Sequence, residues 1–136
     1  MIKIMLVEDN MHARHALKAL ISQQEGIIVL AEASNGQEAI RNIEQEIPDI
    51  VLMDMRMPVM DGLEATKIIK ARWSQIKVII HSMYADSQSD VLLAGADSFL
   101  AKSSNLETLV STIRSSTSTF TITGENPLKE IPPRFA

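Results

Sequence analysis

The chain has 136 residues, a length that suits one domain and leaves no room for a second of ordinary size. It carries 17 acidic and 13 basic residues with a formal net charge of −4, and without a dense basic stripe this balance disfavours nucleic-acid binding by the segment itself. It contains no cysteine, which excludes disulfides, thiolate metal sites and thiol nucleophiles.

Short apolar runs alternate along the chain with segments whose apolar residues recur at helical spacing. The first apolar run, at residues 4–7, predicts a strand. A helical pattern follows over residues 10–23, and either Asp9 or Asn10 can cap it. A second strand is predicted at residues 27–33, which are short and rich in β-branched side chains.

Cap signatures mark the starts of the later helices, because a polar acceptor residue is followed three positions later by a glutamate. These pairs are Asn35 with Glu38, Asp61 with Glu64, and Ser104 with Glu107. The second helix, whose last apolar residue is Ile47, should stop before Pro48, the third near Ser74, and a weaker helix at residues 87–94 should stop at Gly95. The remaining predicted strands are residues 50–53, 77–82 and 98–101.

Five strands that alternate with five helices predict an α/β fold, and near-continuous apolar strands are typical of a parallel sheet covered on both faces. We expect a doubly wound five-stranded parallel sheet of the flavodoxin-like kind, with strand order 2-1-3-4-5. The second strand is then an edge strand, and it ends in Ala33-Ser34-Asn35 without a charged residue.

The composition changes after Ser115. Residues 116–123 are rich in hydroxyl groups, and the polar residues that follow include three prolines. We therefore predict one domain over residues 1–115 and a tail or linker remnant over residues 116–136. Phe120 and Ile122 alternate with polar residues, which leaves an added strand as the alternative.

No apolar run approaches the roughly 20 residues of a membrane-spanning helix, and the chain begins with no basic segment ahead of a long apolar core. We expect a soluble, cytoplasmic protein that has no contact with a membrane.

Four of the predicted strands end beside residues with phosphate or magnesium chemistry, namely Glu8 and Asp9, Asp54, Ser82, and Lys102. In an open parallel sheet, ligands bind outside the carboxyl ends of the strands, so these side chains should meet in one pocket. Three ionised carboxylates cannot share a pocket without a cation, since two charges about 4 Å apart repel by about 4 kcal/mol at an effective dielectric near 20. Mg²⁺ is the natural candidate because it prefers oxygen ligands.

A carboxylate beside such a metal can act as a nucleophile toward a phosphoryl group, and Asp54 has the central position for this role. Lys102 and the Ser82 hydroxyl could then stabilise the oxygens of the attached group.

Three motifs resemble those of two-component response regulator receiver domains: Leu-Val-Glu-Asp-Asn at residues 6–10, Val-Leu-Met-Asp-Met-Arg-Met-Pro-Val-Met-Asp-Gly at 51–62, and Gly-Ala-Asp-Ser-Phe-Leu-Ala-Lys at 95–102. The resemblance covers about residues 2–115 with compatible spacing. It implies that Asp54 accepts a phosphoryl group from a sensor histidine kinase, and that Ser82 and Lys102 contact the phosphoryl oxygens.

The resemblance also implies the magnesium ligands. Asp9 would bind the ion directly, Glu8 mostly through water, and Arg56 through its backbone carbonyl, beside Asp54 itself.

Two positions that belong to the family's switch depart from the commonest pattern. Serine stands at position 82 where threonine is frequent, and phenylalanine stands at 99 where tyrosine is frequent, so Phe99 should bury readily but has no hydroxyl to hydrogen-bond. Ser103 replaces a common proline, and together with Ser82-Met83-Tyr84 it is similar to receivers that precede a LuxR-type helix-turn-helix domain. Tyr84 is a candidate to screen the phosphate from water.

The function implied is a phosphorylation-activated switch that changes the surface of the fourth helix, fifth strand and fifth helix, and that can form a homodimer. It is not an enzyme beyond its own phosphoryl transfer and autodephosphorylation. The chain holds no helix-turn-helix, so DNA contacts would need an output domain absent from it, as in a transcriptional regulator; a stand-alone regulator is the alternative. A magnesium-dependent aspartyl phosphohydrolase is disfavoured because Arg56 stands where a second aspartate is expected.

Other side chains receive no chemical role. We interpret the methionines around Asp54 as packing groups rather than copper ligands, and we expect Arg14 and Lys18 to lie on a solvated helix face that could meet an acidic partner. The histidines, also without an assigned role, are His12, His15 and His81.

Overall fold

Residues 1–83 and 88–117 are described by the computed structural model, and within them strands and helices alternate as predicted. The strands are β1 (Ile2–Val7), β2 (Ile27–Ala33), β3 (Ile50–Met53), β4 (Lys77–Ser82) and β5 (Ser98–Ala101). The helices are α1 (Met11–Ser22), α2 (Gly36–Gln45), α3 (Gly62–Arg72), α4 (Gln88–Leu93) and α5 (Leu106–Ser116).

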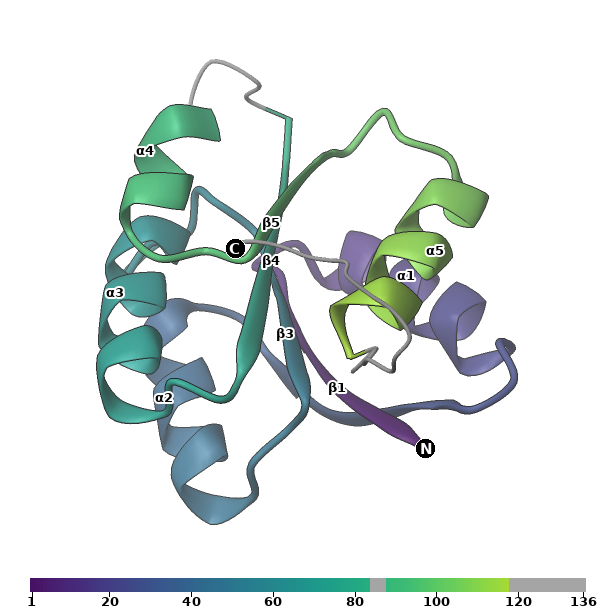
Figure 1. The fold of residues 1–136 in the computed structure, drawn as a ribbon, viewed down its shortest axis with the longest axis horizontal. Helices are drawn as coiled ribbons and strands as arrows, with labels where there is room; N and C mark the ends of the chain where they lie inside the picture. Colours follow the sequence, from purple (N-terminus) through teal and green to yellow (C-terminus); the bar gives the residue numbers. More distant parts are fainter. Residues whose placement is uncertain (84–87, 118–136) are drawn as a thin grey trace, which may run out of the picture.

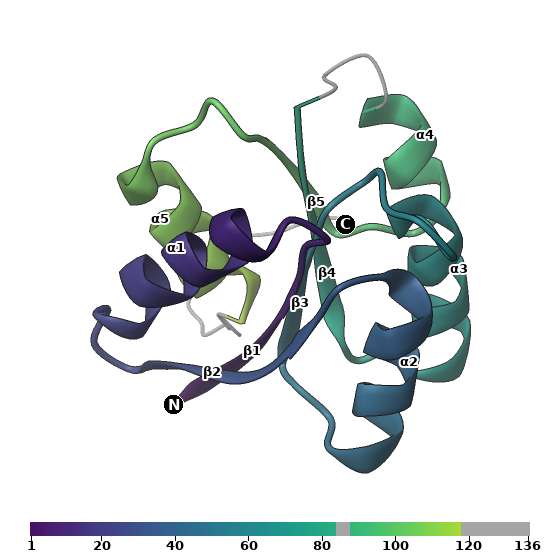
Figure 2. The same cartoon turned by 180° about the vertical axis from the view of Figure 1, so that it is seen from behind.

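All strand pairs are parallel, and the order across the sheet is β2-β1-β3-β4-β5. Helices α2, α3 and α4 cover one face, and α1 and α5 cover the other, as the two opposite views show (Figure 1, Figure 2). The predicted doubly wound, flavodoxin-like fold is therefore confirmed, with β2 at the edge.

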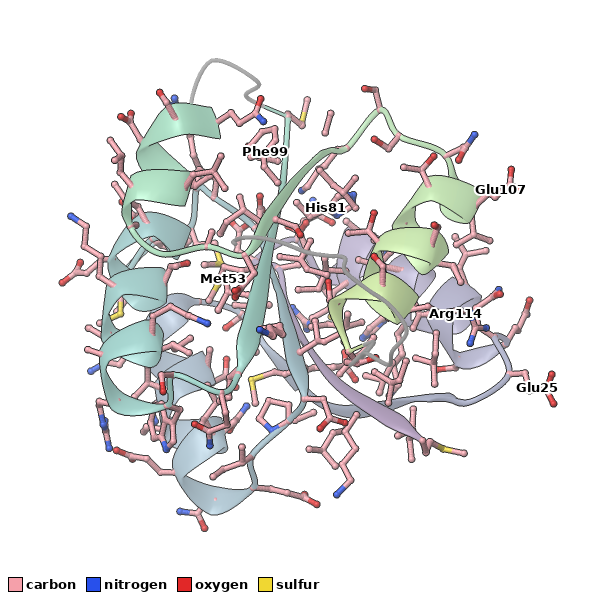
Figure 3. All side chains as sticks on the ribbon, viewed as in Figure 1. Glu25, Met53, His81, Phe99, Glu107 and Arg114 are labelled. Atoms are coloured by element: carbon pink, nitrogen blue, oxygen red, sulfur yellow. The ribbon has the colours of Figure 1, made fainter. Side chains whose placement is uncertain are left out.

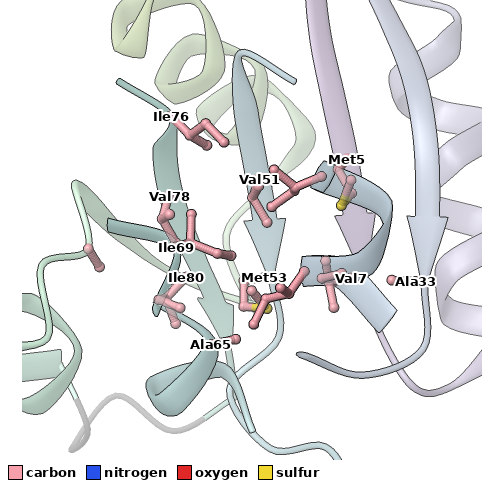
Figure 4. Close-up of a cluster of buried hydrophobic side chains, with 14 of the residues drawn as sticks. Met5, Val7, Ala33, Val51, Met53, Ala65, Ile69, Ile76, Val78 and Ile80 are labelled. Carbon is pink, nitrogen blue, oxygen red and sulfur yellow. The ribbon is translucent and has the colours of Figure 1, made fainter. Parts of the chain in front are cut away.

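The strands are apolar throughout because alternate residues enter two different cores. One core lies under α2, α3 and α4 and contains Met5, Val7, Val51 and Met53 (Figure 4). Their strand neighbours Ile4, Leu6, Ile50 and Leu52 enter the second core with Ile21 of α1 and with Leu109 and Ile113 of α5.

Several element boundaries differ from the prediction or narrow it; β1, for example, begins at Ile2 rather than at residue 4. Helix α2 ends at Gln45, so Ile47 lies outside the helix and is 46% exposed; Ile47 precedes a proline, which restricts it to extended backbone. The cap of α5 is Asn105 rather than Ser104, because the Asn105 side chain accepts the hydrogen bond of the Thr108 N–H at 2.8 Å. At the start of α1 the cap is Asn10, whose side chain accepts a hydrogen bond from the Ala13 N–H.

Helix α5 continues to Ser116, and Thr117 caps it. The rest of the predicted tail, and with it the alternative of an added strand at Phe120 and Ile122, lies outside the described residues, as do Ser87 and Tyr84. Across residues 1–83 and 88–117, none of the helices combines the length and apolar character needed to cross a bilayer.

Candidate functional site

Backbone hydrogen bonds extend the sheet by one residue past three strand ends and so place three of the predicted side chains at one edge. The bonds run from the Glu8 N–H to the Ala33 carbonyl (3.0 Å), from the Asp54 N–H to the Val7 carbonyl (2.9 Å), and from the Lys102 N–H to the Ser82 carbonyl (2.7 Å). The geometry of parallel strands thus brings together residues that are up to 94 positions apart in the sequence.

Glu8, Asp9 and Asp54 form a compact cluster in which one carboxylate oxygen from each residue lies within 4.8 Å of the others. Glu8 is buried, the side chain of Asp54 is 12% exposed, and Asp9 is open to solvent. An oxygen-only set with one solvent-facing member fits Mg²⁺, which binds through few carboxylates and keeps several waters.

Lys102 brings the compensating positive charge from the end of β5. Its Nζ lies 2.6 Å from Glu8 Oε1 and 3.4 Å from Asp54 Oδ2. The other oxygen of each carboxylate accepts a backbone hydrogen bond: the Asn10 N–H donates to Glu8 Oε2 at 3.0 Å, and the Met55 N–H donates to Asp54 Oδ1 at 2.8 Å.

The environment moves the pKa values of the two buried carboxyls in opposite directions. Burial, and after it the negative charge of Glu8, raises the pKa of Asp54 to about 6. Burial also acts to raise the pKa of Glu8, but the hydrogen bonds from Lys102 and from the Asn10 N–H outweigh it and lower that pKa. The pKa of Lys102 is raised, because the two carboxylates outweigh its burial. The two carboxyl groups therefore differ in acidity although they share one pocket.

The loop between β3 and α3 holds the backbone of Asp54 in place. The Gly62 N–H donates to the Met55 carbonyl at 2.8 Å, and a Cβ on Gly62 would lie 2.1 Å from the Asp54 carbonyl oxygen. Arg56 stands on this loop with an exposed side chain and lines the acidic pocket, which has a volume of about 400 Å³. Val59, in the same loop, has a φ of 68°.

Ser82 and Phe99 lie on the β4 and β5 side of this pocket. Ser82 is fully buried and lines a neighbouring pocket of about 350 Å³ together with Lys102. Phe99 is half-buried and packs against the core under α2, α3 and α4. Figure 3 shows Phe99 beside α4, whereas His81 of β4 lies on the α5 side of the sheet.

The methionines near Asp54 are packing groups, as expected. Met53 is fully buried in the first core, and the others that contact that core are Met55, Met57 and Met60. His12 and His15 are exposed, and burial lowers the pKa of His81.

Sequence reasoning missed one side chain that reaches the site from outside. Arg14 does not lie on a solvated face, because its side chain is 15% exposed and its Nη1 donates to the Glu8 carbonyl at 2.7 Å. No pattern in the sequence marks this contact, since it depends on the direction of one side chain at the start of α1.

Comparisons with known proteins agree with the geometry. The family described as "Response regulator receiver domain" matches residues 4–114. The transcriptional regulatory protein LnrK of Bacillus subtilis (strain 168) is 38% identical over 115 residues, which are 83% of this chain and 52% of the relative. The chain therefore spans about half the length of the curated relatives it matches.

Solved structures show the same fold. A DNA-binding response regulator of the LuxR family from Staphylococcus aureus matches with a TM-score of 0.80 and 30% identity, over 85% of this chain and 98% of that one. The response regulator TrrA from Thermotoga maritima, in complex with Mg²⁺ and BeF, matches with a TM-score of 0.78 and 31% identity, over 85% of this chain and 99% of that one. These matches confirm the resemblance drawn from the sequence motifs.

Proposed function

Because this chain belongs to the family of response regulator receiver domains, we propose that it accepts a phosphoryl group on Asp54 from a sensor histidine kinase in a Mg²⁺-dependent reaction. The observation that carries the proposal is the juxtaposition of three carboxylates within 4.8 Å with an ammonium group that contacts two of them. An ordinary structural ion pair needs one carboxylate for one ammonium group, so it does not account for the three carboxylates of this cluster.

The donor set fits a hard divalent cation. Carboxylate oxygens of Glu8, Asp9 and Asp54, with the backbone carbonyl of Arg56, would hold Mg²⁺, and all four residues line the same pocket. When bound, the ion supplies the positive charge that lets an anionic phosphoryl donor approach an anionic pocket. The complex of TrrA with Mg²⁺ and BeF supports this assignment by similarity.

Asp54 has one oxygen available for the transfer. Its Oδ1 is held by the Met55 N–H, while Oδ2 faces Lys102. In the proposed step Oδ2 attacks the phosphorus of a phosphohistidine, the P–O bond forms as the P–N bond breaks, and the electron pair leaves with the imidazole nitrogen. Lys102 then pairs with a phosphoryl oxygen, so the charge that stabilises the free carboxylate also stabilises the product.

We propose that Ser82 and Phe99 transmit the conformational change that follows phosphorylation of Asp54. Ser82 is buried and lines a pocket together with Lys102, and in the proposed mechanism its hydroxyl would join the phosphoryl oxygens. Its movement would make room for Phe99, which already rests partly in the core next to α4, and would change the surface of α4, β5 and α5.

The longer relatives suggest how the signal is used. LnrK is a transcriptional regulatory protein of which the matched residues cover only 52%, so we propose that the chain is the regulatory part of such a regulator. DNA contacts would then belong to an output domain outside this chain, and phosphorylation would favour a homodimer. A stand-alone regulator with the same chemistry is the alternative, and in both cases the chain acts on itself rather than as a general enzyme.

Beryllofluoride with Mg²⁺ tests the proposal, because it mimics an aspartyl phosphate. Amide NMR spectra of the wild-type chain should shift at the residues around Asp54, Ser82 and Phe99, and light scattering should report any dimer. The Asp54→Asn variant should show no shift. Asp61→Asn is the matched control, since it removes one carboxylate from an exposed helix cap that asparagine also satisfies; it should respond like the wild type. An equal response in Asp54→Asn would refute the proposal.

A further inference from the structure

Arg14 links the acidic pocket to the edge strand of the sheet. Its Nη1 donates to the Glu8 carbonyl at 2.7 Å, and its Nε donates to Glu32 Oε1 on β2 at 3.2 Å. The side chain is 15% exposed, so it is held between α1, β2 and the loop that carries the acidic pair.

A hydrogen bond to the Glu8 carbonyl constrains the backbone at Asp9, because this carbonyl belongs to the planar peptide that joins Glu8 to Asp9. The direction of this carbonyl sets the orientation of that peptide, and therefore the direction in which the Asp9 side chain leaves the backbone. The Glu8 N–H is fixed independently by the Ala33 carbonyl of β2. With Arg14 in place, both backbone polar groups of Glu8 are tied to the same neighbouring strand, one of them directly and the other through Arg14 and Glu32.

The far end of this link is itself anchored. The Glu32 backbone carbonyl accepts a hydrogen bond from Asn42 Nδ2 of α2 at 2.9 Å, and Glu32 Oε2 accepts one from Lys18 at 2.8 Å. Two cations of α1 therefore share one carboxylate, but their positions differ. Lys18 is 48% exposed and donates to Glu32, whereas Arg14 donates both to Glu32 and to the loop that carries Glu8.

We infer that Arg14 is a positioning residue, which holds the Glu8–Asp9 peptide in the orientation that lets the acidic cluster bind a divalent cation. This inference rests on the proposed function. A planar guanidinium with several donors in fixed relative directions can serve Glu32 and the Glu8 carbonyl together, whereas a lysine ammonium is a single point of charge on a flexible stem.

Electrostatics and positioning predict opposite results, which makes the inference testable. Removing a positive charge near an acidic pocket should tighten Mg²⁺ binding if charge alone matters. Removing the support of the loop should weaken it. In calorimetric titration of the full chain with Mg²⁺, we expect Arg14→Met to weaken binding by roughly tenfold, as for other residues that orient metal ligands from outside the ligand set.

Two further variants separate charge from geometry. Lys18→Met makes the same change in charge and also removes a partner of Glu32, but it leaves the contact with Glu8 intact; it should bind Mg²⁺ as tightly as the wild type or slightly more tightly. Arg14→Lys keeps the charge but loses the paired donors, and it should remain weakened. If Arg14→Met fails to fold, Arg14→Lys decides the question by the same measurement.

A second measurement needs no metal. The Asn10 N–H, which donates to Glu8 Oε2, should exchange its hydrogen severalfold faster in the metal-free Arg14 variants than in the wild type or in Lys18→Met. Unchanged exchange, or Mg²⁺ binding by Arg14→Met as tight as in the wild type, would overturn the inference while leaving the proposed function intact. A wild-type chain that binds no Mg²⁺ would instead refute the proposed function, and the exchange rates would still show whether Arg14 holds the loop.

Discussion

Glu8 and Asp54 carry the same functional group, and the difference in their behaviour comes from single contacts. Each has one oxygen on a backbone N–H, but the ammonium of Lys102 lies closer to Glu8, at 2.6 Å, than to Asp54, at 3.4 Å. The better-paired carboxyl keeps its charge, and the pKa of the other rises to about 6. In the metal-free protein Asp54 is therefore a source of instability once it ionises.

This difference predicts how stability depends on pH. Because the folded pKa of Asp54 is about 6, above an ordinary carboxyl value of about 4, the contribution of Asp54 to stability should become unfavourable as the pH rises from about 4 to about 6. Asparagine cannot ionise, so Asp54→Asn should be more stable than the wild type at neutral pH by roughly 1–3 kcal/mol. Urea unfolding in a chelator at several pH values measures the difference.

The advantage of the variant should shrink as the pH falls to about 3, below the pKa of Asp54 in both the folded and the unfolded chain, and saturating Mg²⁺ should reverse it by stabilising only the wild type. Asp61→Asn is the control, since Asp61 is exposed. A difference that does not change with pH would show that the charge of Asp54 is not its cause.

Residue types and spacing could predict the acidic cluster, because each member directly follows an apolar run and the topology rule then brings the strand ends together. They could not predict Arg14. A helix residue that donates to a loop carbonyl differs from a solvated arginine only in the direction of its side chain, which is decided by the position of Glu32 on a strand that is remote in sequence.

At the scale of elements, the start of α3 is the tightest point of the site. Gly62 is the first residue of α3, and its α-carbon lies against the Asp54 carbonyl with no space for a Cβ. The helix can approach the end of β3 so closely only because this residue has no side chain.

Gly62→Ala should therefore destabilise the protein, although glycine to alanine normally stabilises a helix by about 1 kcal/mol. The clash is with backbone, so the loop must shift, and we expect a loss of roughly 2–4 kcal/mol together with weaker Mg²⁺ binding. Chemical denaturation measures the first effect and calorimetry the second. Lys67→Ala, at an exposed position of the same helix, should change little; a stabilised Gly62→Ala would contradict the close approach.

The starts of α2 and α3 could be predicted from capping residues in the sequence. The ends of helices and the pairing registers of strands were harder to predict. Asn35 and Asp61 cap α2 and α3 as expected, but the spacing of Ser104 and Glu107 predicts the start of α5 one residue early, because the Asn105 side chain is the one that accepts the capping hydrogen bond. The register shift between Ile4 and Met5 in the pairing of β1 with β2 has no signal in the residue types.

At the scale of the whole molecule, the described residues form two hydrophobic cores, one on each face of the sheet. Helix α5 contributes Ile113, which is fully buried, and ends at Ser116.

A chain shortened after Thr117 should thus keep the unfolding midpoint and Mg²⁺ affinity of the full chain, as measured by thermal melting and calorimetry. The matched control is a chain shortened after Thr112, which also removes Ile113 and should lose roughly 2–5 kcal/mol of stability. A large loss after the first cut would show that residues 118–136 belong to the domain rather than to a tail.

The contact between Glu8 and Lys102 joins the end of β1 to the end of β5, the first and last strands in chain order, across 94 positions of the sequence. During synthesis, the acidic pair leaves the ribosome long before the lysine does, and the lysine reaches it only once β5 has docked beside β4. Contacts this distant in sequence form late in folding. If the chemistry follows the proposed course, a nascent or truncated chain without β5 lacks Lys102 and cannot be phosphorylated efficiently. Only a completely folded domain would then transmit the signal.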